Sequence, residues 1–298
     1  MEEKANILIS TVKHNTAEAL VANVVQLTSL PSVYTKLEEV LKDPDHTRDD
    51  IARVISVDPA LCARTLRVIN SSYYALPNTV QNIPTAINLI GEYDLRNIVL
   101  VTSVVNSVNT LVDSGIDITK FWRHSIRCGI TAKLLAKLKS APDPELLFLS
   151  GLLHDLGQLV IYKNEPELSA TIDWHVENEE SERYEVEQTL LGFSHSVVGA
   201  LLLENWGVPE QLSEIIKYHH QPDDSGRYQF ETVVVALADQ LVHSLELEHD
   251  LVNIDFEKLP ISIHNYLSNL KISTDVLSGM LTTVMEQSLA IEKIICDI

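Results

Sequence analysis

The stretch "PELLFLSGLLHDLGQLVIY", residues 144–162, indicates most clearly how this chain folds. Its apolar residues recur at the spacing of a helix, so it predicts a helical segment. Two ionisable residues, His154 and Asp155, stand where a core helix needs apolar side chains, and Gly151 and Gly157 lie three residues to either side of His154. Glycine inside a helix costs roughly 1 kcal/mol relative to alanine. The two glycines therefore predict that a ligand or another helix closely approaches this face.

Most of the chain shows the same helical periodicity, which predicts an all-α fold. Helix starts are marked by the Thr47 cap with acids in the following turn, and by Asp58 with Pro59 at the first helical position. Gly91 is placed to end one helix before the next begins. The last part, "STDVLSGMLTTVMEQSLAIEKII", also has helical spacing after a Ser-Thr-Asp start.

A polar, glycine-containing loop at residues 113–121 predicts the main boundary in the chain. It separates an N-terminal helical subdomain, residues 1–115, from a histidine-bearing helical subdomain, residues 116–298. The acidic segment at residues 176–188 is expected to be an exposed linker or helix surface.

Composition limits the class of protein. With 298 residues, of which 45% are hydrophobic, the chain can bury a substantial core. It contains no apolar run of the roughly 18 residues that a membrane span needs, and its first residues lack the pattern of a signal peptide. We therefore expect a cytoplasmic protein without a membrane partner. Cys62, Cys128 and Cys296 are widely spaced, which predicts neither a disulfide framework nor a thiolate metal site.

A formal net charge of -20 argues against general nucleic-acid binding. The short helices expected at 47–56 and 59–70 could be a DNA-reading helix-turn-helix, but Pro59 and the neighbouring acids favour ordinary packing. Residues 118–142 contain six bases and no acids. They form either a solvated helix face or a rim that attracts anions. These bases are Lys120, Arg123, Arg127, Lys133, Lys137 and Lys139.

Histidines and aspartates recur on several apolar helical segments. Any one of these histidines could simply be a hydrogen-bonded core residue or lie at a helix end. Asp239, however, is the only acid between Thr232 and Leu241, and a buried carboxylate needs a partner. Imidazole and carboxylate together are ligands of Zn, Mn, Fe or Ni. We therefore expect one or two divalent metal ions, which can lower the pKa of a bound water and hold a phosphoryl oxygen. The candidate ligands are His124, His154, Asp155, His195, His219, His220 and Asp239.

At these residues the chain resembles the HD superfamily of metal-dependent phosphohydrolases, and within it the HDOD family of HD-related output domains in bacterial signalling. The resemblance covers most of residues 25–242. It implies an all-helical fold with an HD-like C-terminal bundle, and a role in relaying signals to partner proteins. The matching motifs are "LPSVYTKLEEVLKDP", "ISVDPALCARTLRVINSSYY", "IPTAINLIG", "FWRHS", "FLSGLLHDLGQLV", "GFSHSVVGALLLENWGVP", "YHH" and "ALAD".

Two departures bear on catalysis. The related HD-GYP phosphodiesterases continue the His-Asp motif to a lysine that can hold phosphate, where this chain has the neutral Gln158. Their Gly-Tyr-Pro signature is also absent after His220, where the chain reads "QPDDSGRYQF". Arg123 and Arg127 could replace part of the lost positive charge at a substrate.

The first hypothesis is a non-catalytic signalling module that contacts protein partners and whose histidine cluster stabilises the bundle or responds to a ligand. The second is a metal-dependent phosphohydrolase acting on a nucleotide or cyclic dinucleotide, with Asp155 in the catalytic site. A DNA-binding regulator is the third, although so acidic a surface predicts weak or absent DNA affinity. The apolar stripe near the C-terminus could support a homodimer.

Overall fold

A computed structural model describes residues 16–27, 32–109, 116–179, 182–248 and 255–296. Within these ranges every regular element is a helix, so the prediction of an all-α fold is confirmed. The first residues of the chain and residues 113–115 of the predicted boundary loop lie outside the described residues. The described residues form two compact units, each built from separate stretches of chain. The boundary between residues 115 and 116 stays a prediction.

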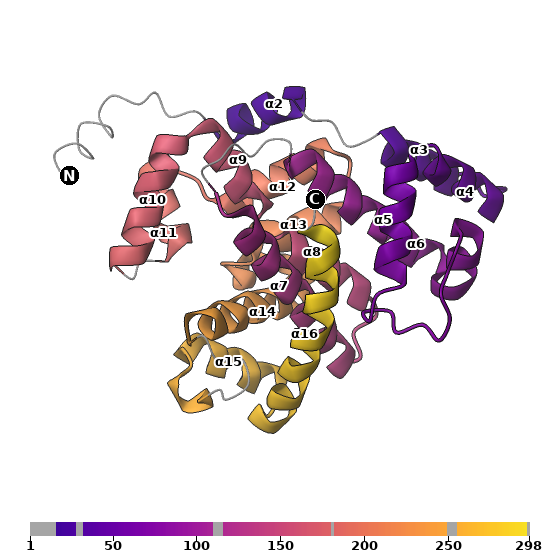
Figure 1. The fold of residues 1–298 in the computed structure, drawn as a ribbon. Helices are drawn as coiled ribbons and strands as arrows, with labels where there is room; N and C mark the ends of the chain where they lie inside the picture. The colour runs from indigo at the N-terminus through magenta and orange to yellow at the C-terminus, as the bar shows by residue number, and fades with distance from the viewer. Residues whose placement is uncertain (1–15, 28–31, 110–115, 180–181, 249–254, 297–298) are drawn as a thin grey trace. The chain divides into compact units, whose positions relative to one another are not determined.

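Unit 1 contains the described residues among 16–27, 116 and 153–232. Its apolar core joins Leu20 and Val24, Ile172, and Val198 with Leu202. Figure 1 shows its helices α10 and α11 side by side. The helical elements of unit 1 are α2 (Ala17–Leu27), α9 (Leu156–Asn164), α10 (Pro166–Glu179), α11 (Arg183–Leu191), α12 (His195–Asn205), α13 (Glu210–Tyr218), η1 (Pro222–Asp224) and η2 (Gly226–Tyr228).

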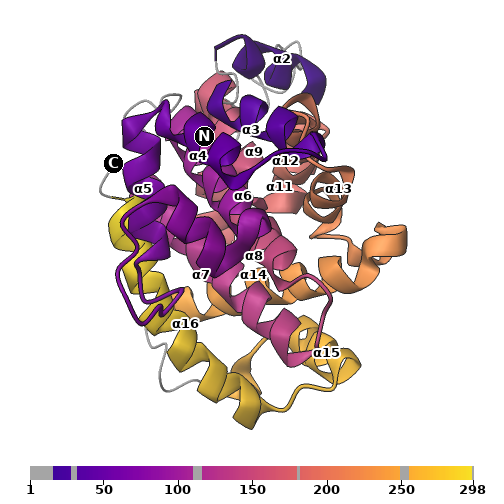
Figure 2. The ribbon, with the colours of Figure 1, turned by 90° about the vertical axis from the view of Figure 1, so that its right-hand side faces the viewer.

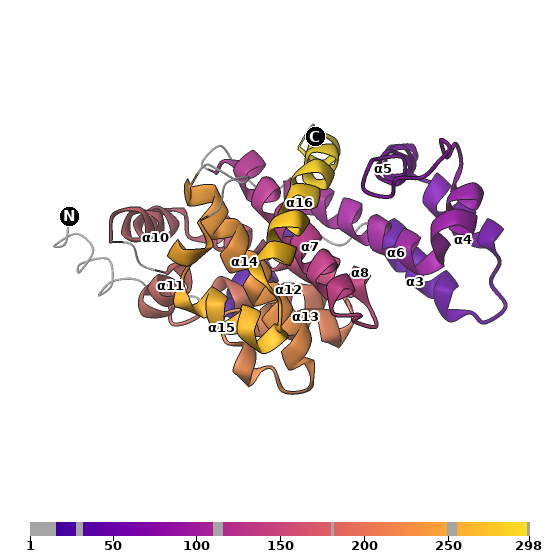
Figure 3. The ribbon, with the colours of Figure 1, turned by 90° about the horizontal axis from the view of Figure 1, so that it is seen from below.

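Unit 2 contains the described residues among 32–109, 117–152 and 233–296. In it α3 packs on α4 (Figure 2), and α7 packs on α16 (Figure 3). Its elements are α3 (Ser32–Lys42), α4 (Arg48–Ser56), α5 (Pro59–Ile69), α6 (Ile83–Asn109), α7 (Ile118–Leu138), α8 (Pro144–Leu153), α14 (Gln229–Glu248), η3 (Phe256–Lys258), α15 (Ile261–Leu270) and α16 (Thr274–Ile295), of which the last residue of α8 and the first turn of α14 fall in unit 1.

The predicted helix signals in the first part of the chain are confirmed. Thr47 caps α4 in a capping box with Asp50. Asp58 caps α5, and its side chain accepts hydrogen bonds from the first backbone N–H groups after Pro59. Gly91 interrupts α6 with a φ of 84°, a left-handed value that glycine adopts without steric cost. Local sequence therefore sets where these helices begin and bend.

The periodicity of residues 144–162 predicts one helical segment, but the structure does not form a single continuous helix there. It forms α8 and α9, which are separated by a turn at His154 and Asp155. Asp155 takes the N-cap position of α9, although its side chain makes no capping hydrogen bond. The break leaves both ionisable side chains at a helix junction. There they make contacts that a residue inside a continuous helix could not reach.

The two glycines beside this junction allow neighbouring helices to approach closely. A Cβ on Gly157 would lie 1.9 Å from the backbone oxygen of His195 and 2.7 Å from the nitrogen of Gly199, both in α12. A Cβ on Gly151 would lie 2.8 Å from the backbone oxygen of Cys128 in α7. Only glycine allows these approaches, so Gly157 sets the spacing of α9 and α12, and Gly151 that of α8 and α7.

None of the described helices is by itself both long and apolar enough to cross a bilayer. One pair of helices, α11 with α12, meets the criteria of length and composition when taken together, with a bend of 80° between them.

Substituting Gly157→Ala should destabilise the protein by about 3 kcal/mol, because the added methyl would overlap backbone atoms that cannot rotate away. Gly279→Ala is the matched control: Gly279 lies in α16, and a Cβ there would meet nothing within 4 Å. That change should stabilise the protein by about 0.5–1 kcal/mol. Urea unfolding followed by circular dichroism measures both effects. Equal stabilities of the two variants would contradict the proposed role of Gly157.

Candidate metal centre

His154 and Asp155 occupy the turn between α8 and α9, and both are buried. His154 Nε2 lies 3.3 Å from Asp155 Oδ2. The other carboxylate oxygen, Oδ1, lies 3.1 Å from His195 Nε2. Asp155 thus contacts two imidazoles through its two oxygens. Such an arrangement requires positive charge beside a carboxylate that has little access to water.

His195 begins α12, and a carboxylate from α11 holds it in place. Glu187 Oε2 accepts a hydrogen bond of 2.7 Å from the backbone N–H of His195 and one of 2.6 Å from its Nδ1. One carboxylate oxygen therefore satisfies the start of α12 and also orients the ring. Ser194 occupies the N-cap position of α12, but its side chain makes no capping hydrogen bond, and its hydroxyl lies 2.7 Å from that of Ser196.

His219 and His220 follow the last residue of α13 and bring two more imidazoles to this group. The His219 ring lies 5.0 Å from that of His154 and 4.0 Å from that of His220, between ring centres. His219 Nδ1 donates to the backbone oxygen of Ile216 at 2.6 Å, and His220 Nε2 lies 3.0 Å from His195 Nε2. We call these five residues, His154, Asp155, His195, His219 and His220, the unit 1 cluster.

The charges of the unit 1 cluster stabilise one another. Burial disfavours the charged form of His195, but Glu187 and Asp155 outweigh it and raise the pKa of His195 to about 9. Burial would likewise raise the pKa of Asp155. His154 and His195 outweigh this effect and hold that pKa well below its usual range. The raised pKa of His195 therefore favours a positive charge between the carboxylates of Glu187 and Asp155.

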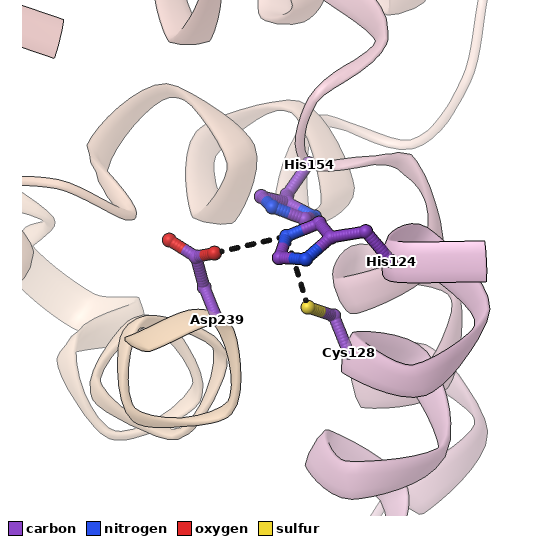
Figure 4. Close-up of side chains that lie close together, drawn as sticks. All are labelled: His124, Cys128, His154 and Asp239. Carbon is purple, nitrogen blue, oxygen red and sulfur yellow. Dashed lines mark hydrogen bonds and ion pairs between the residues drawn. The ribbon is translucent and has the colours of Figure 1, made fainter. Parts of the chain in front are cut away.

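A second cluster lies in unit 2, where α7 faces α14 (Figure 4). His124 Nε2 lies 3.1 Å from Asp239 Oδ1, and His124 Nδ1 lies 3.1 Å from Glu246 Oε2. Cys128 Sγ, one turn along α7, lies 3.4 Å from His124 Nε2. Burial lowers the pKa of His124, but Cys128 and the two carboxylates outweigh this effect, so that its pKa lies well above the usual value. We call His124, Cys128, Asp239 and Glu246 the unit 2 cluster.

The arginines on α7 have acidic partners within unit 2. Arg127 Nη1 lies 3.2 Å from Glu246 Oε1, and Arg127 Nε lies 3.4 Å from Glu292 Oε1 on α16. Arg123 Nε lies 3.4 Å from Glu292 Oε2. These ion pairs join α7 to α14 and α16. The assignment of Arg123 and Arg127 to a substrate stays a prediction.

The remaining bases of residues 118–142 divide between interior and surface. Lys133 is buried: its ammonium donates to the Tyr73 hydroxyl at 2.7 Å and forms an ion pair with Glu145. Lys120 and Lys137 are exposed. The segment is therefore not a uniform solvated face, because three of its bases are committed to ion pairs within unit 2.

The predicted ligands fall into two sets. The structure brings five of them together in the unit 1 cluster and pairs the other two, His124 and Asp239, in the unit 2 cluster. That one pocket joins five of them, with His195 and His220 at its edge, stays a prediction; the five are His124, His154, Asp155, His219 and Asp239.

Sequence reasoning missed Glu187, Glu246 and Cys128. The acidic segment containing Glu187 was expected to be exposed, which is wrong at this residue because its side chain is fully buried. The four-residue spacing of His124 and Cys128 within one helix was an available signal, since it puts both side chains on one face. No comparable local pattern links Glu187 to His195.

The donor sets fit a divalent metal ion. In each of two trios, His195 with His219 and His220, and His154 with Asp155 and His219, the donor atoms lie within 4.8 Å of one another. His195 and His219 also have the outer contacts typical of metal-binding histidines: a carboxylate holds Nδ1 of the first, and a backbone carbonyl holds Nδ1 of the second. Both contacts orient Nε2 for a ligand role.

Comparisons with known proteins agree with this fold. A family model described as the HDOD domain matches residues 27–222. A crystal structure titled "Putative phosphohydrolase" from Shewanella amazonensis SB2B is 26% identical, with a TM-score of 0.75 over 95% of this chain and 99% of that one. An HDOD domain protein of unknown function from Geobacter sulfurreducens is 23% identical, with a TM-score of 0.72 over 93% of this chain and 97% of that one.

A curated relative, an uncharacterized protein of Treponema pallidum (strain Nichols), is 26% identical over 209 residues. The match covers 69% of this chain but spans only 40% of the relative's length. The family model, in contrast, covers more than half of this chain, and the helical fold and the His-Asp motif agree with it. The chain therefore belongs to the HDOD family.

Proposed function

We propose that this protein is a signalling output module that acts through protein partners, and that its histidine clusters hold divalent metal without phosphohydrolase catalysis. The observation that carries the proposal is the pairing of Arg123 and Arg127 with Glu246 and Glu292. The two arginines are the candidates for holding a substrate phosphate, and both already have anionic partners.

The first step of the argument concerns the metal. The unit 1 cluster offers imidazole nitrogens and a carboxylate, which suit Fe, Mn, Ni or Zn. When bound, such an ion supplies Lewis acidity and can activate a water molecule. Three of the donor side chains, His154, His195 and His219, are at most 1% exposed. Burial of this degree suits an ion that stabilises the helices, because a metal-bound site transfers its binding free energy to folding.

The second step concerns phosphate. Phosphoryl transfer needs cationic groups that hold the charge spreading over the phosphate oxygens. Gln158, one turn after the His-Asp pair, is neutral and only partly exposed. Arg127 would have to leave both Glu246 and Glu292 to contact a phosphate, which would leave two carboxylates without their counter-ion. The cost of breaking these pairs supports a non-catalytic role.

Protein partners, including a second copy of this chain, belong to the same proposal, as does a cytoplasmic location, which suits three widely spaced thiols. The charge of -20 supports a protein partner over DNA, because an acidic surface releases few counter-ions from a phosphate backbone.

A metal-dependent phosphohydrolase is the alternative function. The close approach of buried histidine and aspartate donors favours it. The similarity to the Shewanella protein, which is described as a phosphohydrolase, also favours it. In this alternative Asp155 acts in the catalytic site, and a cyclic dinucleotide or nucleoside phosphate is the substrate.

Protein loaded with Mn or Fe should not hydrolyse cyclic dinucleotides or nucleoside phosphates at about 1 per second, a rate typical of enzymes. Chromatographic measurement of product over time gives the rate. Turnover at that rate which disappears in Asp155→Ala, and persists in the control Asp275→Ala on α16, would establish the alternative function. Activity that appears only on Gln158→Lys would support the proposal, because it locates the missing step in the lost positive charge.

Glu187→Gln should weaken metal binding by about 10- to 100-fold, because the neutral amide no longer orients and polarises the His195 ring. Glu185→Gln is the matched control, since Glu185 is an exposed residue of the same helix, α11. Titration with Mn²⁺, followed by the electron paramagnetic resonance signal of the free ion, gives the dissociation constants. A folded Glu187→Gln protein with unchanged affinity would contradict the role of Glu187 in orienting a metal ligand.

A further inference from the structure

The unit 2 cluster places a thiol among ligand-type groups. The neighbours of His124 Nε2 include Asp239 Oδ1 at 3.1 Å and Cys128 Sγ at 3.4 Å. Figure 4 shows Asp239 reaching from α14 toward the ring, and Cys128 on the same helix as His124. Cys128 is fully buried. Its position therefore differs from that of Cys62 and Cys296, which are partly exposed.

The hydrogen bond on the other side of the His124 ring decides what Nε2 can do. Glu246 Oε2 lies 3.1 Å from Nδ1, and an ionised carboxylate can only accept. Nδ1 must therefore donate. In the neutral ring Nε2 then carries a lone pair, and this lone pair faces a carboxylate oxygen and a sulfur. Three electron-rich atoms at this distance need a cation among them, which is either a proton or a metal ion.

The distances suit a tetrahedral ion. With bonds of about 2.0 Å to nitrogen or oxygen and about 2.3 Å to sulfur, tetrahedral ligands stand about 3.3 Å apart for N and O and about 3.5 Å for N and S. The observed separations are 3.1 and 3.4 Å. The donor atoms of all three residues lie within 4.8 Å of one another, so one ion could contact the three of them.

The charges and the packing agree with this geometry. With His124 neutral, a Cys128 thiolate, Asp239 and Glu246 carry three negative charges, and Arg127 beside Glu246 contributes one positive charge. The remaining two negative charges match a divalent cation. The backbone of Cys128 is held by α8, because a Cβ on Gly151 would lie 2.8 Å from the Cys128 backbone oxygen. Close packing therefore fixes the backbone that carries the thiol.

We propose that Cys128 supplies a thiolate ligand, beside His124 Nε2 and Asp239, to a divalent ion of the zinc type. This inference rests on the proposed metal-binding function and deepens it, because a thiolate favours Zn²⁺ over Mn²⁺ or Mg²⁺. It also revises the expectation, drawn from cysteine spacing, that the chain has no thiolate metal site. The ligands implied by the family resemblance are histidine and aspartate only.

The test uses Co²⁺ as a spectroscopic substitute for Zn²⁺. Full-length protein stripped with a chelator is titrated with Co²⁺, and a thiolate-to-cobalt charge-transfer band is followed in the near ultraviolet. The band should appear in the native protein and in the control carrying Cys62→Ser and Cys296→Ser, and Zn²⁺ should abolish it. In Cys128→Ser the band should be lost.

Two outcomes would overturn the inference, and they are distinguishable. Co²⁺ that binds, as measured by metal analysis, without a thiolate band would remove Cys128 from the site and leave the proposed metal-binding function standing. Failure of both Co²⁺ and Zn²⁺ to bind native protein would overturn that function as well.

A second measurement needs no variant, so it decides the question even if Cys128→Ser does not fold. X-ray absorption of the native protein saturated with Zn²⁺, so that both clusters are filled, should show a sulfur neighbour at about 2.3 Å. A shell made only of nitrogen and oxygen would overturn the inference.

Discussion

The contact between Gly157 and the backbone of His195 constrains the rest of unit 1. Because the glycine has no Cβ, α9 can lie against the first turn of α12, where any other residue would meet a backbone oxygen at 1.9 Å. Asp155 begins α9 and His195 begins α12, so this spacing brings a carboxylate to 3.1 Å from an imidazole. A packing requirement on one residue thus places the charged groups of two helices.

The unit 1 cluster is costly unless its charges are matched. Glu187 and His195 are almost completely buried, and a carboxylate in such surroundings needs hydrogen bonds and an opposite charge. Glu187 receives both from the backbone N–H and the ring of His195. Since this partner also orients the ring, the same contacts that stabilise the fold prepare the ligand. A metal ion would then replace protons that are already held in place.

The two clusters share one arrangement, although they lie in different units. In each, a carboxylate binds one ring nitrogen of a histidine, Glu187 for His195 and Glu246 for His124, and the other ring nitrogen faces an aspartate. The aspartates are Asp155 and Asp239. A carboxylate that accepts a hydrogen bond from one ring nitrogen raises the basicity of the imidazole and fixes its tautomer. Both clusters can therefore hold either a proton or a cation at the inner nitrogen.

The sequence by itself determined the helical class, because periodicity and caps such as Thr47 and Asp58 act over a few residues. It also identified the family, through the His-Asp motif and its flanking helices. It could not place the break between α8 and α9, since the apolar residues on both sides of His154 and Asp155 keep the spacing of one helix.

Only the tertiary structure decided which groups meet. Glu187 is eight residues from His195 in the chain, and Glu246 is 122 residues from His124, so no local pattern could pair them. The same holds for Arg127, whose partners come from two other helices. Burial is the physical reason. From sequence alone a charged residue is expected at the surface, and only tertiary packing shows that it is buried beside a partner that offsets the cost of removing it from water.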